Sequence, residues 1–170
     1  MRKILETISL GALAIAALLT WSALTGPHHL PDKIPTHFDS SGHANGWDSS
    51  TSLVLLPLIA LSIYLLITVI SAVLSRFPEL FNFPVQVTEE NRPRLQALAF
   101  EMIAWIKAEM VCLFAWVQWM TIQAARMPDG GFSSASGYMV GTFGIVAILL
   151  GTIGWFLVAM LRAAQTQPVS

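Results

Sequence analysis

The histidines and carboxylates between the first two apolar runs are the side chains best suited to bind a ligand or a metal ion. They lie in or just before residues 30–47, LPDKIPTHFDSSGHANGW. Imidazole beside carboxylate can bind Zn²⁺ or Cu²⁺, and imidazole can also report pH by gaining a proton. The spacing 28, 29, 37 and 43 matches no familiar zinc module. We therefore expect no metal and no other cofactor, with a metal site and a pH-sensitive site as alternatives to a purely structural loop. The four histidines are His28, His29, His37 and His43.

A second set of polar residues interrupts the third apolar run. Lys107, Glu109 and Gln118 would lie at or within the membrane, where an ionisable group is by default a functional candidate. At about 100° per residue, Lys107 and Gln118 share one helix face and Glu109 lies on another. Each charge then needs a partner from another helix, a neighbouring subunit or water. We expect structural hydrogen bonds or extension of the Lys107 ammonium into water, with transport or proton relay as the alternative.

The sequence offers no recognisable catalytic arrangement. The histidines share one loop, and no nucleophile lies in a nucleophile-elbow motif. The single cysteine, Cys112, excludes an internal disulfide and a cysteine-based metal cluster. We expect a protein that is not an enzyme.

The elements that position these residues are long apolar helices. The chain has 170 residues, of which 55% are hydrophobic and 11% charged, whereas soluble domains carry about 25% charged residues. Four runs are long enough to cross a bilayer, which takes about 20 residues. The prediction is an all-α fold, an integral membrane four-helix bundle forming a single domain over residues 1–170. The expected helices cover about 4–24, 53–74, 93–125 and 138–161, with an outer loop at 26–52 and a cytoplasmic loop at 76–92.

The distribution of basic residues predicts the orientation, because lysine and arginine near helix ends stay in the cytoplasm. Six lie on one side of the expected bundle and only Lys33 and Arg126 on the other. We therefore expect both termini in the cytoplasm of a bacterium, with loop 26–52 outside its inner membrane. The net charge of −1, without a basic block, gives no reason to expect nucleic-acid binding. The six are Arg2, Lys3, Arg76, Arg92, Arg94 and Arg162.

The outer loop carries strong local signals for an ordered structure. Prolines at 27, 31 and 35 favour extended backbone, and residues 34–39 alternate as a short strand would. The segments DSSG and ANG then predict two turns. A compact lid over the helix ends, with Ile34, Phe38 and Trp47 buried, explains this pattern as well as a binding site does.

The loop also resembles a known family. The pattern L-P-D-x-I-P-x-H-F-x-x-x-G-x-x-x-G-W, from Leu30 to Trp47, is similar to the signature of the bacterial domain-of-unknown-function family 1648. Two further blocks are similar too, Phe81–Asn91 and Trp105–Trp119. The resemblance implies a multi-pass membrane protein with this loop outside. Some relatives are longer proteins that resemble the immunity protein against a secreted sporulation-delay toxin, which also relays a signal to a repressor. The candidate binding residues of the loop are Asp32, Pro35, His37, Phe38, Gly42 and Trp47.

Glycines of the fourth helix form a candidate packing surface, because small residues let another backbone approach closely in a membrane. The stripe packs either inside the bundle or against another subunit. Its members are Gly137, Gly141, Gly144 and Gly151.

Together these patterns predict a protein that binds or senses through its outer loop, in an immunity-like or signalling-like role. The alternative is a small accessory or scaffold subunit of a larger membrane complex. The expected partners are the lipid bilayer and either an extracytoplasmic peptide or other membrane subunits.

Overall fold

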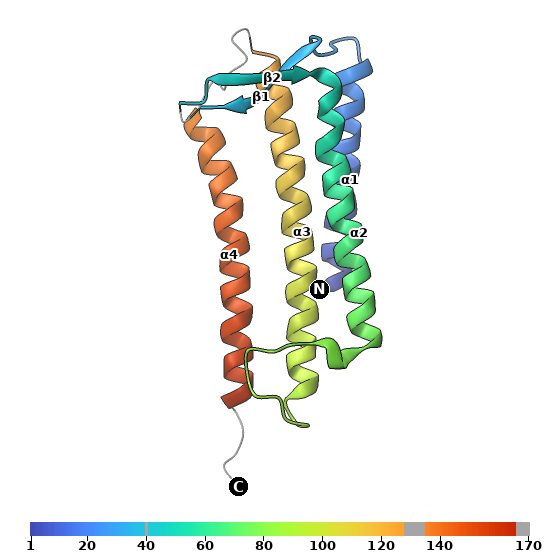
Figure 1. The fold of residues 1–170 in the computed structure, drawn as a ribbon, viewed down its shortest axis with the longest axis vertical. Coiled ribbons are helices and arrows are strands. Elements are labelled where there is room, and N and C mark those ends of the chain that lie inside the picture. Colours follow the sequence, from blue (N-terminus) through green and yellow to red (C-terminus); the bar gives the residue numbers. More distant parts are fainter. Residues whose placement is uncertain (40, 128–134, 166–170) are drawn as a thin grey trace.

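Four long helices form an elongated bundle in the computed structural model, with a small sheet across one end (Figure 1). The structure describes residues 1–39, 41–127 and 135–165, with the side chains of the last helix described from Met139 onward. The chain folds into α1 (Arg2–Thr25), α2 (Leu55–Arg76), α3 (Arg92–Ala125) and α4 (Ala135–Gln165). The N-terminus and the last described residues of α4 lie toward the end of the bundle opposite the sheet, which we call the far end (Figure 1).

The loop between α1 and α2 folds into a β-hairpin, so the chain is mostly helical, as predicted, with a small two-stranded sheet added in this loop. Strand β1 (Lys33–Phe38) pairs antiparallel with β2 (Ala44–Ser49), and a 3₁₀ helix (Ser50–Val54) leads into α2. Pro31 and Pro35 disfavour helix in this segment. The turn passes through Gly42, whose φ of 82° is a left-handed conformation that glycine adopts without strain.

Helix α3 is the central element of the bundle. It packs against α1, α2 and α4, whereas the other helices carry large exposed hydrophobic side chains such as Leu66, Phe143 and Ile148. The buried residues of α3 include Val111 and Ile122 and also the polar Lys107 and Gln118. The polar groups of the third apolar run therefore point toward other helices.

Three helices of the described chain are long and apolar enough to cross a membrane. They are Arg2–Thr25, Ser50–Arg76 and Met139–Gln165. Helix α3 is not among them, because its glutamates, lysine, glutamines and tryptophans lower its hydropathy. The exposed apolar faces of the three spans favour contact with lipid.

Two apolar clusters close the ends of the bundle. At the hairpin end, Leu30, Ile34 and Leu53 pack with residues of α1 and α3, including Ala23 and Ile122. At the far end, the connection 81–87, which follows a short 3₁₀ helix (Pro78–Leu80), packs on a cluster from α3 and α4. That cluster consists of Leu95, Ala99, Met160 and Ala163.

Candidate functional site

The hairpin is held by contacts between residues of the loop pattern. His37 of β1 lies opposite Gly46 of β2, and the His37 Nδ1 atom hydrogen-bonds the side-chain oxygen of Asn45. A Cβ atom on Gly46 would lie 2.8 Å from the His37 Cβ atom, closer than such atoms pack. The glycine at 46 is therefore required by the histidine beside it.

Asp39 organises the hairpin turn. Its carboxylate accepts hydrogen bonds from the backbone N–H groups of Ser41 at 2.8 Å and His43 at 2.9 Å. The hydrogen bond from the His43 N–H is the main cause that lowers the pKa of the Asp39 carboxyl below its ordinary value. The folded turn therefore favours the ionised form of Asp39.

The other loop residues divide between the interior and the surface. Pro35 is buried and Phe38 half-buried, whereas Trp47 is 51% exposed. The expected burial of Trp47 is thus wrong, since its side chain is exposed. Asp32 has an exposed side chain, and its backbone carbonyl accepts a hydrogen bond from the Ser50 N–H at 2.8 Å.

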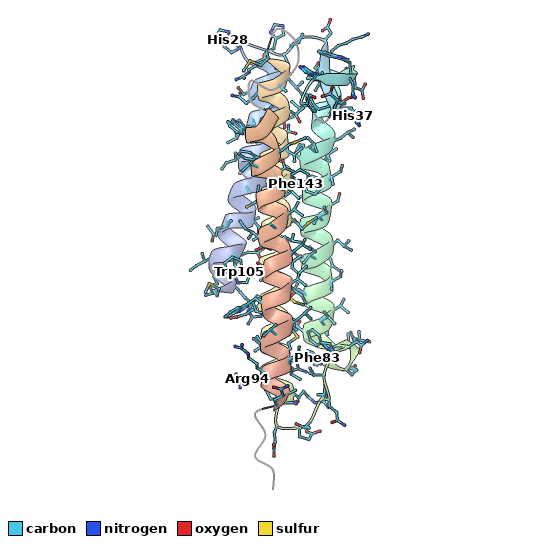
Figure 2. All side chains as sticks on the ribbon, turned by 90° about the vertical axis from the view of Figure 1, so that its left-hand side faces the viewer. His28, His37, Phe83, Arg94, Trp105 and Phe143 are labelled. Carbon is cyan, nitrogen blue, oxygen red and sulfur yellow. The ribbon has the colours of Figure 1, made fainter. Side chains whose placement is uncertain are left out.

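The histidines do not converge on a common point. His37 bonds Asn45, and His43 Nδ1 lies 3.6 Å from the Asp39 carboxylate. His28 and His37 project from separate parts of the hairpin end (Figure 2). Within residues 1–39, 41–127 and 135–165, no group of three or more histidine, cysteine, aspartate or glutamate side chains is arranged to hold a metal ion.

An apolar groove of about 660 Å³ runs between α1 and α2 in the half nearer the hairpin. Seven residues of α1, from Leu13 to Thr25, and four residues between Val54 and Leu61 line it. No charged side chain is among them. The two hydroxyl groups in the lining, Thr20 and Thr25, already donate to carbonyls of their own helix at 2.8 and 2.9 Å. The groove therefore offers an uncharged surface with its polar groups satisfied.

Lys107 joins three helices. Its ammonium lies 2.6 Å from a carboxylate oxygen of Glu6 on α1 and donates to the Thr68 hydroxyl of α2 at 3.1 Å. The Tyr64 hydroxyl donates to the other Glu6 oxygen, and the Lys107 ammonium lies 4.6 Å from the Tyr64 ring centroid. The ammonium is paired within the bundle and does not extend into water.

The remaining polar residues of α3 contact the faces that their spacing predicts. Gln118 donates to the Thr20 hydroxyl of α1 at 2.7 Å, on the same face as Lys107. Glu109 accepts a hydrogen bond from the Thr152 hydroxyl of α4 at 2.6 Å. The other carboxylate oxygen of Glu109 and the amide oxygen of Gln118 are buried, and neither has a hydrogen-bond partner in the described part of the chain.

The comparison with known families identifies part of the chain. Residues 12–61 match the family described as Domain of unknown function (DUF1648). This segment is a DUF1648 domain. No curated protein and no solved structure matches the chain.

The DUF1648 domain contains the part of α1 nearer the hairpin, the hairpin itself and the start of α2. Every residue that lines the α1–α2 groove lies within it. The similar blocks Phe81–Asn91 and Trp105–Trp119 lie outside the matched residues. The domain is therefore a hairpin with an apolar groove beneath it, carried on two helices.

The glycines of α4 have different surroundings. A Cβ atom on Gly141 would overlap the indole of Trp116, so this glycine fits α3 closely. Gly144 and Gly151 have nothing within 4 Å of a Cβ position. The surroundings of Gly137 lie outside the described residues.

Sequence reasoning missed the partners of the polar residues on α3. Glu6 was counted within an apolar run, although an acid in the second turn of a membrane helix signals a buried partner. Thr20 and Thr152 carry no such signal, because membrane threonines usually bond to their own helix. The groove also left no pattern in the sequence, since its lining consists of ordinary apolar residues.

Proposed function

We propose that the chain is a four-helix protein of a bacterial inner membrane, with the hairpin outside and both termini in the cytoplasm. The arrangement of α3 supports a fourth crossing, because it lies among three apolar spans and pairs its charged groups inward. The excess of lysine and arginine at the far end supports the orientation.

Within this arrangement, the DUF1648 domain acts by binding a ligand at the outer surface and not by catalysis. The observation that carries this proposal is the groove of about 660 Å³ lined entirely by the domain. Pockets that bind small ligands commonly measure about 300–1,000 Å³ and have mostly apolar walls. The groove lies beside an ordered hairpin whose exposed side chains include Thr36, His37 and Trp47.

The chemistry of the α1–α2 groove and of the exposed face of the hairpin defines the class of ligand. The groove takes apolar side chains and would leave a charge without a partner, which costs several kcal/mol. The hairpin offers an imidazole, an indole and exposed strand edges to polar or backbone groups of the same ligand. A hydrophobic or amphipathic secreted peptide satisfies both, and an immunity-like or signalling-like role would follow from such binding.

A groove-filling variant tests this proposal. The chain in nanodiscs is titrated with a panel of fluorescent amphipathic peptides, and binding is measured by anisotropy. Ala17 lines the groove and is exposed, so Ala17→Phe fills the groove without disturbing the core. Leu18→Phe is the matched control, because Leu18 is 67% exposed and lies outside the lining.

The peptide of the panel that binds the unmodified chain most tightly is used to compare the variants. We expect Ala17→Phe and His37→Ala to bind this peptide at least tenfold more weakly than the unmodified chain does, and Leu18→Phe to bind it equally well. Equal affinity of the unmodified chain and Ala17→Phe for the peptide would exclude the groove as the peptide-binding site. Unchanged affinity of His37→Ala would exclude a role for the hairpin histidine.

A second candidate function is that of a small accessory subunit that packs into a larger complex through α4. The specific observation is that Gly144 and Gly151 face open space, which leaves room for another backbone. Purification in a mild detergent followed by native mass spectrometry measures whether the chain is part of a complex. A complex that is lost in Gly144→Leu supports the subunit role, and a monomer at all concentrations contradicts it.

A further inference from the structure

A second groove lies between α3 and α4 at the far end of the bundle. It has two adjoining chambers that share Leu98 and Trp155. The larger measures about 490 Å³ and reaches Gly151 and Phe156, and the smaller measures about 200 Å³ and ends between Arg94 and Arg162. Figure 2 shows Arg94 and Trp105, which line the two chambers, on the same side of α4. The groove lies outside the DUF1648 domain and does not depend on its proposed function.

The charges along this groove are unevenly distributed. Arg94 and Arg162 line the small chamber, both are exposed, and neither forms a salt bridge with a carboxylate in the described residues. The large chamber is mainly apolar, and its lining also includes one acid, Glu101, and the N-terminal residue Met1. Trp155 stands between the chambers with 68% of its surface exposed, as an indole at a membrane–water interface does.

We propose that this groove binds an anionic phospholipid, with its phosphate between Arg94 and Arg162 and an acyl chain in the large chamber. Guanidinium groups bind phosphate oxygens in pairs of parallel hydrogen bonds, and basic pockets between membrane helices bind anionic headgroups. An inorganic anion would satisfy the arginines but would leave the apolar chamber unfilled.

Lipid binding to the purified chain tests the charged half of the site. Phosphatidylglycerol and phosphatidylcholine with identical acyl chains are titrated separately, and native mass spectrometry counts the bound lipids. Inorganic phosphate is added as a competitor. The variant Arg94→Gln/Arg162→Gln removes both groove arginines. The matched control Arg76→Gln/Arg92→Gln removes two exposed arginines outside the groove lining.

We expect one phosphatidylglycerol to bind in preference to phosphatidylcholine. Each arginine near an anionic surface contributes enough that the double groove variant should bind this lipid roughly tenfold to thirtyfold more weakly, with the control unchanged. Equal binding of the two lipids would overturn the proposal. So would an equal loss in the control, or displacement of the lipid by an equimolar amount of inorganic phosphate.

A separate variant tests the apolar half of the site. It also tests lipid binding in the groove if the arginine variant fails to fold. Gly151 lines the large chamber with nothing within 4 Å of a Cβ position, so Gly151→Leu fills the chamber without a clash. Gly154→Leu is the control on the same helix, because Gly154 also has nothing within 4 Å of a Cβ position and does not line the groove. Loss of bound phosphatidylglycerol in Gly151→Leu alone supports the lipid site. Retention of the lipid in Gly151→Leu contradicts it.

Discussion

The ion pair between Glu6 and Lys107 allows a test in which the two partners should respond differently to removal. The Lys107 side chain is 9% exposed and that of Glu6 40% exposed. Replacement Glu6→Gln leaves a buried ammonium without a counter-charge, and removing one partner of a buried ion pair costs about 3–5 kcal/mol. Replacement Lys107→Met leaves a partly exposed carboxylate that still accepts the Tyr64 hydroxyl, so we expect about 1 kcal/mol.

The double variant completes this test. Glu6→Gln/Lys107→Met leaves no charge at the site, and we expect it to be more stable than Glu6→Gln alone. The free energy of unfolding is measured in detergent micelles by circular dichroism, with Lys3→Met as a control that removes an exposed charge from the same helix. A larger loss for Lys107→Met than for Glu6→Gln, or simple addition of the two losses, would refute the pairing.

Three further predictions concern the hairpin and α4. Gly141→Ala should destabilise the bundle by about 1–3 kcal/mol, because its Cβ overlaps an indole, whereas Gly144→Ala should not; thermal unfolding compares the two. Gly46→Ala should disturb the hairpin through contact with His37, seen as faster exchange of the strand amide protons. The pKa of the Asp39 carboxyl is lowered in the folded state, so its ionised form stabilises the turn. This stabilisation is complete at pH values above the pKa of the unfolded chain, and it should disappear as the pH falls through the pKa of the folded state. The exchange rates of the amide protons in the turn, measured as a function of pH, report this loss of stability, and Asp39→Asn should remove the pH dependence.

Part of this fold could be predicted from the sequence because membrane helices and turns have local signals. The apolar runs indicated helices close to those observed, although α4 begins at Ala135 and ends at Gln165, outside the expected 138–161. The alternation at 34–39 predicted a strand, and the position of Gly42 predicted a turn. The second strand was not predicted, because ANGWDS lacks the alternation of apolar residues that indicates a strand.

The site was harder to predict because its features depend on which helices are neighbours. The spacing of Lys107, Glu109 and Gln118 showed that they face different directions, but not that Glu6 and Thr152 would meet them. Both grooves are lined by residues of more than one helix, and helix spacing in the bundle has no counterpart in the periodicity of one chain segment. Local pattern therefore identified the first strand and the turn of the hairpin, whereas three-dimensional packing was needed to find the surfaces beside it.

The most direct test of the account is the side of the membrane on which the hairpin lies, because the proposed function requires an outer hairpin. Single cysteines are placed at Thr36 in β1 and at Glu79 at the far end, both exposed, in a chain with Cys112→Ala. Intact cells are treated with a membrane-impermeant maleimide. The account predicts labelling of Thr36→Cys in intact cells and of Glu79→Cys only after permeabilisation. Labelling of Glu79→Cys in intact cells, with Thr36→Cys protected, would contradict it.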